Sequence, residues 1–208
     1  LGSTNTALME RPHPRVGTGE ALLAEYQTAG RGRRGRTWVA PPGGAICLSF
    51  SWVFAEVPRD LGALGLVIGV CAMEALQRLG VVGVGLKWPN DLLINDRKLG
   101  GILIELRAES SGPACVVIGI GLNIALGAQL LEQIAATGLT PIDLVNAGLK
   151  GAQRNAVAAG HTGKIIAHLE AEGFRIRAAE MITLTTERAE SFYEVHKERP
   201  FYPSLVEF

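Results

Sequence analysis

The chain has 208 residues, of which 48% are hydrophobic, so it can bury a core and is not a disordered protein. Twenty Lys and Arg side chains balance 20 Asp and Glu side chains, which gives a formal net charge of zero. This balance argues against a protein that coats nucleic acid or an anionic membrane, because both require an excess of positive charge. Any anion must therefore bind to a local cluster of basic residues.

Cysteine usage and hydropathy indicate a cytoplasmic protein without a membrane partner. Cys47, Cys71 and Cys115 lie far apart in apolar runs, which is typical of buried thiols in a reducing compartment and not of disulfides or a metal site. The longest apolar run, residues 61–73, is shorter than the roughly 20 residues that a membrane span needs. The start of the chain has no secretory signal pattern.

Hydrophobic patterning predicts mixed strands and helices over the first 138 residues. A first helix is expected after Ser3, Thr4 and Asn5, which offer an N-cap. The helix expected at 60–79 is apolar nearly all round, so it should lie inside. Residues 21–27 are ambiguous between helix and strand. The other predicted elements are strands at 45–53, 81–87, 92–94, 99–106 and 114–124, a hairpin turn at Asn95–Asp96, and a helix at 127–138.

Four arginines and three glycines fill residues 30–36. The glycines fit the G-x-G-x-x-G dinucleotide pattern, but a double-proline turn follows in place of the required helix, so we reject that interpretation. Guanidinium groups bind carboxylate and phosphate oxygens, and their mutual repulsion would keep the loop mobile until an anion orders it. The pattern therefore predicts a lid over an anion. The alternatives are a solvated basic turn and, less favoured at zero net charge, a nucleic-acid patch.

Three further stretches place polar or glycine residues in or beside strands. Lys87 ends a predicted strand, where it can meet a carboxylate or a phosphate or be an ordinary surface lysine. Glycines at 100–101 and at 119 and 121 predict a flat ligand or another chain segment against the backbone, with a β-bulge as the alternative. Asn123 offers an amide to a base or a phosphate.

Together and in this order, these stretches closely resemble the catalytic domain of biotin protein ligases. The resemblance covers about residues 1–136 and rests on the blocks at 3–5, 25–27, 30–38, 87–91, 98–103 and 119–123. It implies an α/β (α+β) fold, with a mixed β-sheet and packed helices. It also implies a biotin–[acetyl-CoA-carboxylase] ligase, which activates biotin with ATP to biotinyl-5′-AMP and then transfers biotin to a lysine of a biotin carboxyl carrier protein domain.

The same resemblance implies roles for individual residues. Arg33 and Lys87 would be catalytic, because with the Mg²⁺ that accompanies ATP they neutralise charge in the transition state. The residues implied to bind biotin are Ser3, Thr4, Asn5, Gln27, Arg31, Gly32, Arg33, Lys87, Gly100 and Gly101. Those implied to bind the nucleotide are Arg31, Arg33, Trp38, Asn90 and Asn123. No side-chain nucleophile, no metal held by the protein and no nucleic-acid partner are expected, and a homo-oligomer is left open.

Beyond residue 138 the pattern changes. A helix is predicted at 162–172, a strand at 174–184 and a helix at 185–196. Residues 155–208 resemble the first part of nucleoside diphosphate kinase, above all in the Lys-Glu-Arg-Pro-Phe block at 197–201. This resemblance implies a partial ferredoxin-like α/β fragment. Gln153 replaces that family's phosphate-binding lysine, and its phosphorylated histidine would lie beyond Phe208, so no kinase activity is expected.

The sequence therefore predicts two units and a junction. A C-terminally incomplete ligase-type domain would span 1–138, a junction 139–154 and a kinase-like fragment 155–208. No helix-turn-helix segment precedes the first block, so a repressor role is not expected. Two alternatives stay open: a protein that binds biotin or a nucleotide without turnover, and a kinase-like partner module without the catalytic histidine.

Overall fold

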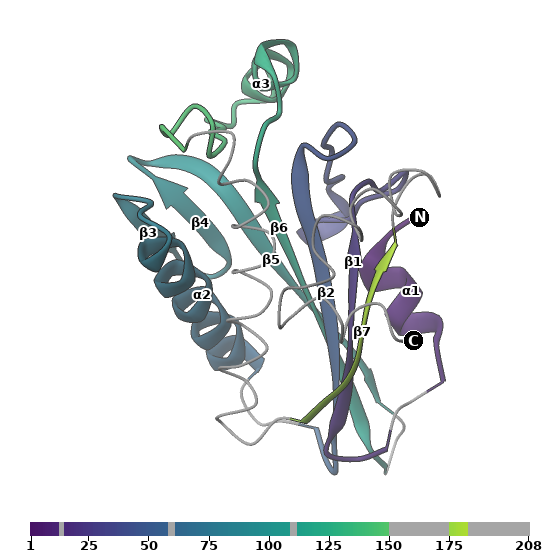
Figure 1. The fold of residues 1–208 in the computed structure, drawn as a ribbon. Helices are drawn as coiled ribbons and strands as arrows, with labels where there is room; N and C mark the ends of the chain where they lie inside the picture. The colour runs from purple at the N-terminus through teal and green to yellow at the C-terminus, as the bar shows by residue number, and fades with distance from the viewer. Residues whose placement is uncertain (13–14, 58–60, 109–111, 150–174, 183–208) are drawn as a thin grey trace, which may run out of the picture.

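The computed structural model describes residues 1–12, 15–57, 61–108, 112–149 and 175–182. At its centre is a seven-stranded sheet in the order β3-β4-β5-β6-β2-β1-β7 (Figure 1). The strands are β1 (Thr18–Ala24), β2 (Ala45–Phe54), β3 (Val84–Lys87), β4 (Asp91–Ile94), β5 (Arg97–Ala108), β6 (Ala114–Asn123) and β7 (Arg175–Ile182). The helices of the described residues are α1 (Thr4–Glu10), α2 (Leu61–Arg78) and α3 (Ala128–Ala135), and a 3₁₀ turn spans Arg33–Gly35.

The strand pairings confirm the predicted mixed sheet with packed helices. Neighbouring strands from β3 to β1 pair antiparallel, and β7 pairs parallel with β1. The predicted hairpin turn joins β4 to β5, and Asn95 and Asp96 have φ values of 48° and 61°. Both residues therefore adopt the left-handed conformation that a tight two-residue hairpin turn requires. The ambiguous stretch at 21–27 contributes to β1, whose residues 21–24 are buried.

The strand predicted at 174–184 is confirmed as β7, which lies next to β1 on the other side from β2 (Figure 1). β7 belongs to the part of the chain that resembles nucleoside diphosphate kinase, yet it extends the same sheet as the first 123 residues. The helices predicted at 162–172 and 185–196, and with them most of the ferredoxin-like fragment, lie outside the described residues. The boundaries of the three predicted segments stay a prediction.

Helix α2 covers one face of the sheet (Figure 1). Ile68 and Leu76 are fully buried in the same cluster as Phe50 of β2. Leu66 and Val67, on the outer side, are 48% and 49% exposed, so the expectation that this helix lies inside is wrong. A helix on one face of a sheet needs an apolar stripe on one side only. No helix among the described residues is long and apolar enough to cross a membrane.

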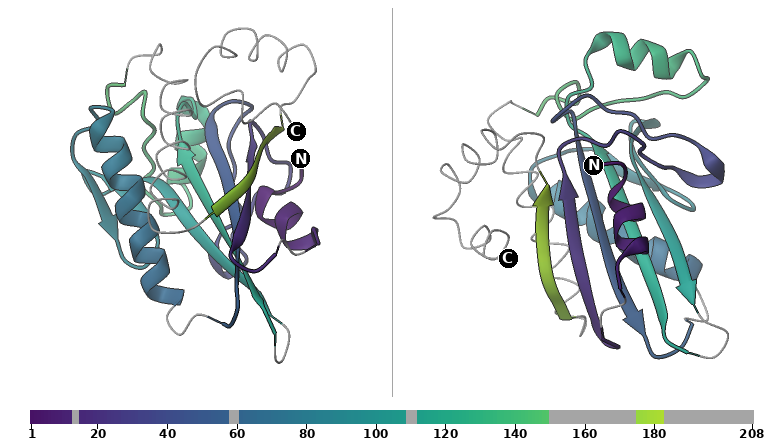
Figure 2. Two further views of the ribbon diagram at one scale, coloured as in Figure 1. Left: turned by 60° about the horizontal axis from the view of Figure 1, so that its bottom comes forward. Right: turned by 90° about the vertical axis from the view of Figure 1, so that its right-hand side faces the viewer.

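Helix α1 packs on the opposite face, as the turned view in Figure 2 shows. Leu8 is buried there with Leu22 and Val117. Ser3 is the predicted N-cap, and its Oγ accepts a hydrogen bond from Thr6 N at 3.4 Å. The helix has only seven residues, so it covers part of this face and leaves the rest of the strand surface for other segments.

Residues 139–149, predicted as part of a junction, pack against the main hydrophobic core. Ile142 and Leu144 are 4% and 0% exposed and belong to the same buried cluster as the central strands. Ile142 N donates a hydrogen bond to Lys98 O at 2.9 Å, which fastens the segment to β5. These residues therefore close one end of the sheet and carry part of its stability.

Leu144→Ala should lower the free energy of unfolding by about 2–5 kcal/mol, because it leaves a cavity in the core. Val145→Ala is the matched control, since Val145 is 48% exposed, and it should change stability by less than about 0.5 kcal/mol. Urea denaturation of both variants measures the difference. Equal midpoints for the two variants would contradict the packing of this segment.

Candidate active site

A cleft of about 840 Å³ lies between the sheet, the Arg loop (residues 30–36) and the segment that carries α3. It brings together every predicted site residue except Gly100. The predicted residues that line it are Ser3, Thr4, Asn5, Gln27, Arg31, Gly32, Arg33, Trp38, Lys87, Asn90, Gly101 and Asn123. The Arg loop and Lys87 thus face the same hollow, although 50 residues or more separate them in the chain. This arrangement is the one that the predicted charge neutralisation requires.

Gly100 is the predicted site residue that does not line the cleft. A β-bulge at Leu99 interrupts the pairing of β4 with β5, so the bulge alternative holds at this position. A Cβ atom on Gly100 would lie 2.6 Å from Gly121 O, so close packing against β6 explains this glycine. Gly101 is different, because a Cβ atom there would have no neighbour closer than 3.7 Å and would extend into the cleft.

The two glycines of β6 let other parts of the chain lie against the strand. A Cβ atom on Gly119 would be 2.2 Å from Asn5 Oδ1, and one on Gly121 would be 2.6 Å from the indole ring of Trp38. Segments of this chain, rather than a ligand, therefore occupy the space that these glycines leave. The glycines set how deeply Asn5 and Trp38 sit in the cleft.

A buried polar network forms one end of the cleft. Thr4 N and Thr4 Oγ1 donate to Gln27 Oε1 at 2.7 and 3.0 Å, and Ser49 Oγ contacts both Thr4 Oγ1 and Asn5 Oδ1. Three oxygen–oxygen contacts thus share the two hydroxyl hydrogens of Thr4 and Ser49. At least one of these contacts therefore lacks a hydroxyl hydrogen, which leaves an oxygen able to accept a hydrogen bond from a ligand.

Cys47 borders this network and is 4% exposed. Burial raises the pKa of the Cys47 thiol to about 11, and a hydrogen bond with Gln27 opposes that rise to a smaller extent. The thiol is therefore neutral near pH 7 and a poor nucleophile. It shapes the cleft without adding charge to it.

The Arg loop folds back over the cleft. Its base is closed by a hydrogen bond from Trp38 N to Gly30 O at 2.9 Å. Near its tip, Arg33 Nη1 donates to Asn90 Oδ1 at 2.9 Å, so the loop reaches the turn between β3 and β4. The loop covers the cleft in the way that a lid would, and its predicted mobility before an anion binds stays a prediction.

Positive charge dominates the cleft although the whole chain is neutral. Within the described ranges, the charged side chains that line it are Arg31, Arg33, Arg34, Arg36, Lys87, Lys98 and Asp91. Lys98 Nζ pairs with Asp91 Oδ1 at 2.6 Å, and Arg31 Nη2 pairs with Glu105 Oε1 at 2.7 Å. The cations that face no carboxylate among the described residues are Arg33, Arg34, Arg36 and Lys87. The cleft is therefore built for an anion.

Sequence reasoning missed three side chains of the site. Lys98 stands in a block singled out for its glycines, Ser49 lies in a predicted strand, and Glu105 follows Gly101 by four residues in another strand. The alternation of side chains along strands could have put Glu105 on the cleft side with Gly101. Nothing in the sequence indicated that residues around α3, including Leu130, Ile134, Leu139 and Pro141, line the cleft.

Comparison with known families agrees with this geometry. Residues 1–123, more than half of the chain, match the model of the biotin/lipoate A/B protein ligase family. The chain belongs to this family. Structural similarity supports the assignment: the chain matches the biotin protein ligase from Aquifex aeolicus in complex with biotin and ATP, with a TM-score of 0.62 and 30% sequence identity over 81% of this chain and 67% of that one.

Two curated members of the family are similar in sequence. The bifunctional ligase/repressor BirA of Escherichia coli is 42% identical over 82% of this chain and 51% of its own length. The biotin--[acetyl-CoA-carboxylase] ligase of Mycobacterium tuberculosis is 35% identical over 91% of this chain and 68% of its own length. The chain thus spans about half to two thirds of these relatives.

The C-terminal part matches a second family. Residues 153–208 match the model of nucleoside diphosphate kinase. The nucleoside diphosphate kinase of Halorhodospira halophila is 56% identical over 26% of this chain and 38% of its own length. Both suspected resemblances are therefore confirmed, the first over the described core and the second over residues of which the structure describes only β7.

Gly121→Ala should displace the Trp38 ring, because the new methyl group would overlap it. We expect a changed near-ultraviolet circular dichroism spectrum and a loss of about 1–3 kcal/mol in the free energy of unfolding. Gly101→Ala is the control, since its methyl group has room, and it should keep the parent spectrum. A parent-like spectrum and stability for Gly121→Ala would refute the close approach of Trp38 to β6.

Proposed function

We propose that this chain activates biotin with ATP to biotinyl-5′-AMP and passes the biotinyl group to a lysine of a carrier protein. The observation that carries the proposal is the meeting of two unlike ends in one cleft, an acceptor-rich network and a cluster of cations that face no carboxylate in the described part of the chain. Biotin has matching ends, because its ring urea donates two N–H groups and its chain ends in a carboxylate. The solved relative from Aquifex aeolicus, which is described with biotin and ATP, supports the same pair of ligands.

The acceptor-rich end suits the urea of biotin. Thr4, Gln27 and Ser49 supply oxygens that already outnumber the available hydroxyl hydrogens, so N–H groups of a ligand relieve the shortage. Beside this end, the Cys47 thiol is neutral and Gly101 has no side chain, so an uncharged part of a ligand can lie there. A cleft of about 840 Å³ is within the range of common ligand sites, roughly 300–1,000 Å³.

The cationic end addresses the chemical obstacle of the first step. A carboxylate oxygen of biotin bonds to the α-phosphorus of ATP, while the bond from that phosphorus to the bridging oxygen breaks and pyrophosphate leaves with the electron pair. Both reactants are anions, so they repel each other. Arg33 and Lys87 would lower this repulsion and stabilise the charge that develops on phosphate oxygens. Lys98 also lines the cleft, but its charge is paired with Asp91, so it would contribute less than Arg33 and Lys87.

Magnesium enters this proposal as part of the substrate MgATP. Among the described residues, no group of three or more His, Cys, Asp or Glu side chains could hold a metal ion, and the one carboxylate that lines the cleft, Asp91, is paired with Lys98. These residues do not fit a metal site built by the protein. The roles derived for the side chains therefore do not depend on one.

In the second step, the amine of a carrier lysine attacks the carbonyl carbon of biotinyl-5′-AMP, AMP leaves and the amine loses a proton. We propose a biotin carboxyl carrier domain as the partner and the cytoplasm as the location. The name of the Mycobacterium tuberculosis relative, an acetyl-CoA-carboxylase ligase, supports the partner, and the burial of all three cysteines agrees with a reducing compartment.

Incubation of the chain with biotin and MgATP should release pyrophosphate and form biotinyl-5′-AMP, measured by chromatography. Lys87→Ala should slow this step about 10²- to 10³-fold, because it removes a charge that acts on the transition state. Arg78→Ala is the control, since Arg78 lies on the exposed side of α2 in a surface ion pair with Glu74, and it should leave the rate unchanged.

The same incubation separates the alternatives. A protein that only binds biotin would show saturable binding without any adenylate, and such a result would refute the proposed catalysis. Addition of an isolated biotin carboxyl carrier domain tests the second step, because the carrier should gain the mass of one biotinyl group. A carrier that stays unmodified while adenylate accumulates would refute the proposed transfer.

A further inference from the structure

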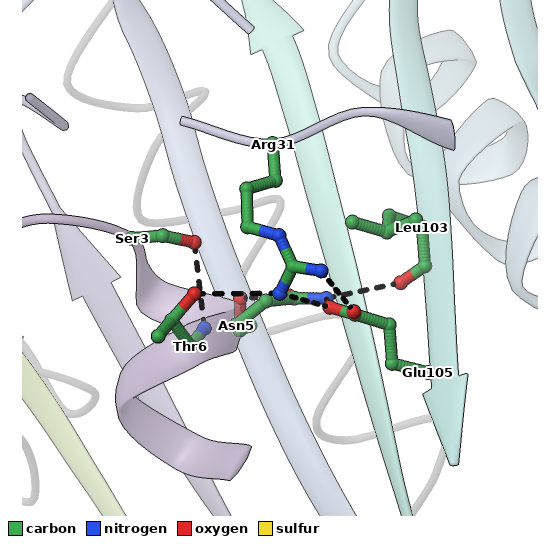
Figure 3. A network of polar contacts seen from close by, with 7 residues as sticks. Ser3, Asn5, Thr6, Arg31, Leu103 and Glu105 are labelled. Carbon is green, nitrogen blue, oxygen red and sulfur yellow. Dashed lines mark hydrogen bonds and ion pairs between the residues drawn. The ribbon is translucent and has the colours of Figure 1, made fainter. Parts of the chain in front are cut away.

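Arg31 of the Arg loop is tied to the sheet by an ion pair (Figure 3). Its Nη2 lies 2.7 Å from Glu105 Oε1, its Nη1 donates to Glu105 Oε2 at 3.3 Å, and the same Nη1 lies 3.4 Å from Thr6 Oγ1. Two parallel contacts between a guanidinium and a carboxylate fix orientation as well as distance. The Glu105 side chain is 18% exposed, whereas that of Arg31 is 48% exposed.

The same carboxylate also holds Asn5. Asn5 Nδ2 donates to Glu105 Oε2 at 3.0 Å and to Leu103 O at 3.4 Å, and its Oδ1 contacts Ser49 Oγ. These partners fix the orientation of the buried amide, because its nitrogen must face the carboxylate and its oxygen the hydroxyl. Glu105 therefore connects a residue of the polar network at one end of the cleft with the loop that covers it (Figure 3).

This pairing changes the role expected for Arg31. Its charge is already matched by Glu105, so it contributes less to anion binding than Arg33 or Lys87, which face no carboxylate among the described residues. Glu105 itself is not among the residues that line the cleft. It can act on a ligand only through the two side chains that it holds.

We propose that Glu105 is a positioning residue that holds the Arg loop closed through Arg31 and orients Asn5 for substrate binding. The consequence for loop position rests on the ion pair alone. The consequence for biotin affinity rests on the proposed function. A carboxylate is required at this position because a neutral amide cannot accept from both the guanidinium and the Asn5 amide without offering a donor in return.

Limited digestion with trypsin tests the loop without any need for catalysis. Arg33 and Arg34 at the loop tip are exposed, so trypsin cleaves there whenever the loop leaves the sheet. Glu105→Gln should raise the rate of this cleavage about tenfold, as expected when a coupled contact that restrains a segment is lost. Glu74→Gln is the matched control, because it removes the carboxylate of a surface ion pair on α2, and it should leave loop cleavage unchanged.

The charge-swapped variant Arg31→Glu with Glu105→Arg separates positioning from general loss of structure. It restores the ion pair, so loop cleavage should return to within about threefold of the parent rate. It leaves Asn5 Nδ2 beside a cation, so the KM for biotin should stay raised about tenfold, as in Glu105→Gln, while kcat changes less. A raised KM with nearly unchanged kcat is the sign of a lost binding contact.

Parent-like cleavage of the loop in Glu105→Gln would overturn the proposal, as would fast cleavage that persists in the charge-swapped variant. Urea denaturation, run first, restricts the comparison to conditions where every variant is folded. If the parent chain forms no biotinyl-5′-AMP, the proposed function fails, and the digestion experiment still decides whether Glu105 positions the loop.

Discussion

Electrostatic repulsion between two acids is the constraint around which this cleft is organised. In a chain with no net charge, the described residues place six basic side chains around one hollow and one carboxylate in its lining. The basic groups come from the Arg loop, the end of β3 and the start of β5, so no single segment could supply them. Bringing them together against their own repulsion requires a rigid support, and the seven-stranded sheet with α2 packed beneath it provides one.

The support works because small residues lie on one face of the central strands. Gly119 and Gly121 let Asn5 and Trp38 lie directly on β6, while the opposite face of the same strand carries large buried side chains such as Ile118 and Ile120. The alternation of strands thus separates two tasks. One face makes the core with α2, and the other leaves room for a ligand and for the residues that would hold it.

Local pattern was enough to predict much of this arrangement. The Asn95–Asp96 turn has a short-range sequence signature, and the apolar runs of β2 and β6 are long enough to be identified as buried strands from the sequence. Family resemblance assigned charge neutralisation to both Arg33 and Lys87, and the structure places both side chains on one cleft. What failed depends on contacts between distant residues. The sequence left a β-bulge near Gly100 open as an alternative, and only the pairing of β5 with β4 places it at Leu99 and removes Gly100 from the cleft.

The same reason explains the other omissions. Glu105 gains its importance from Asn5 and Arg31, which are 100 and 74 residues away, and no local pattern reports such pairs. Residues 139–149 lack periodicity, yet Ile142 and Leu144 complete the core because Lys98 fixes their backbone against β5. β7 lies within a segment that resembles another family and still extends the sheet beside β1. Sheet edges accept a strand through backbone groups, which carry little sequence information.

The most direct test of the central claim is a calorimetric titration of the chain with a stable analogue of biotinyl-5′-AMP in which a methylene group replaces the carbonyl of the mixed anhydride. If the acceptor-rich network and the cations belong to a single site, the analogue should bind one per chain, more tightly than biotin or AMP alone, and should prevent both from binding. Independent, simultaneous binding of biotin and AMP in the presence of the analogue, or no binding of the analogue at all, would contradict the account.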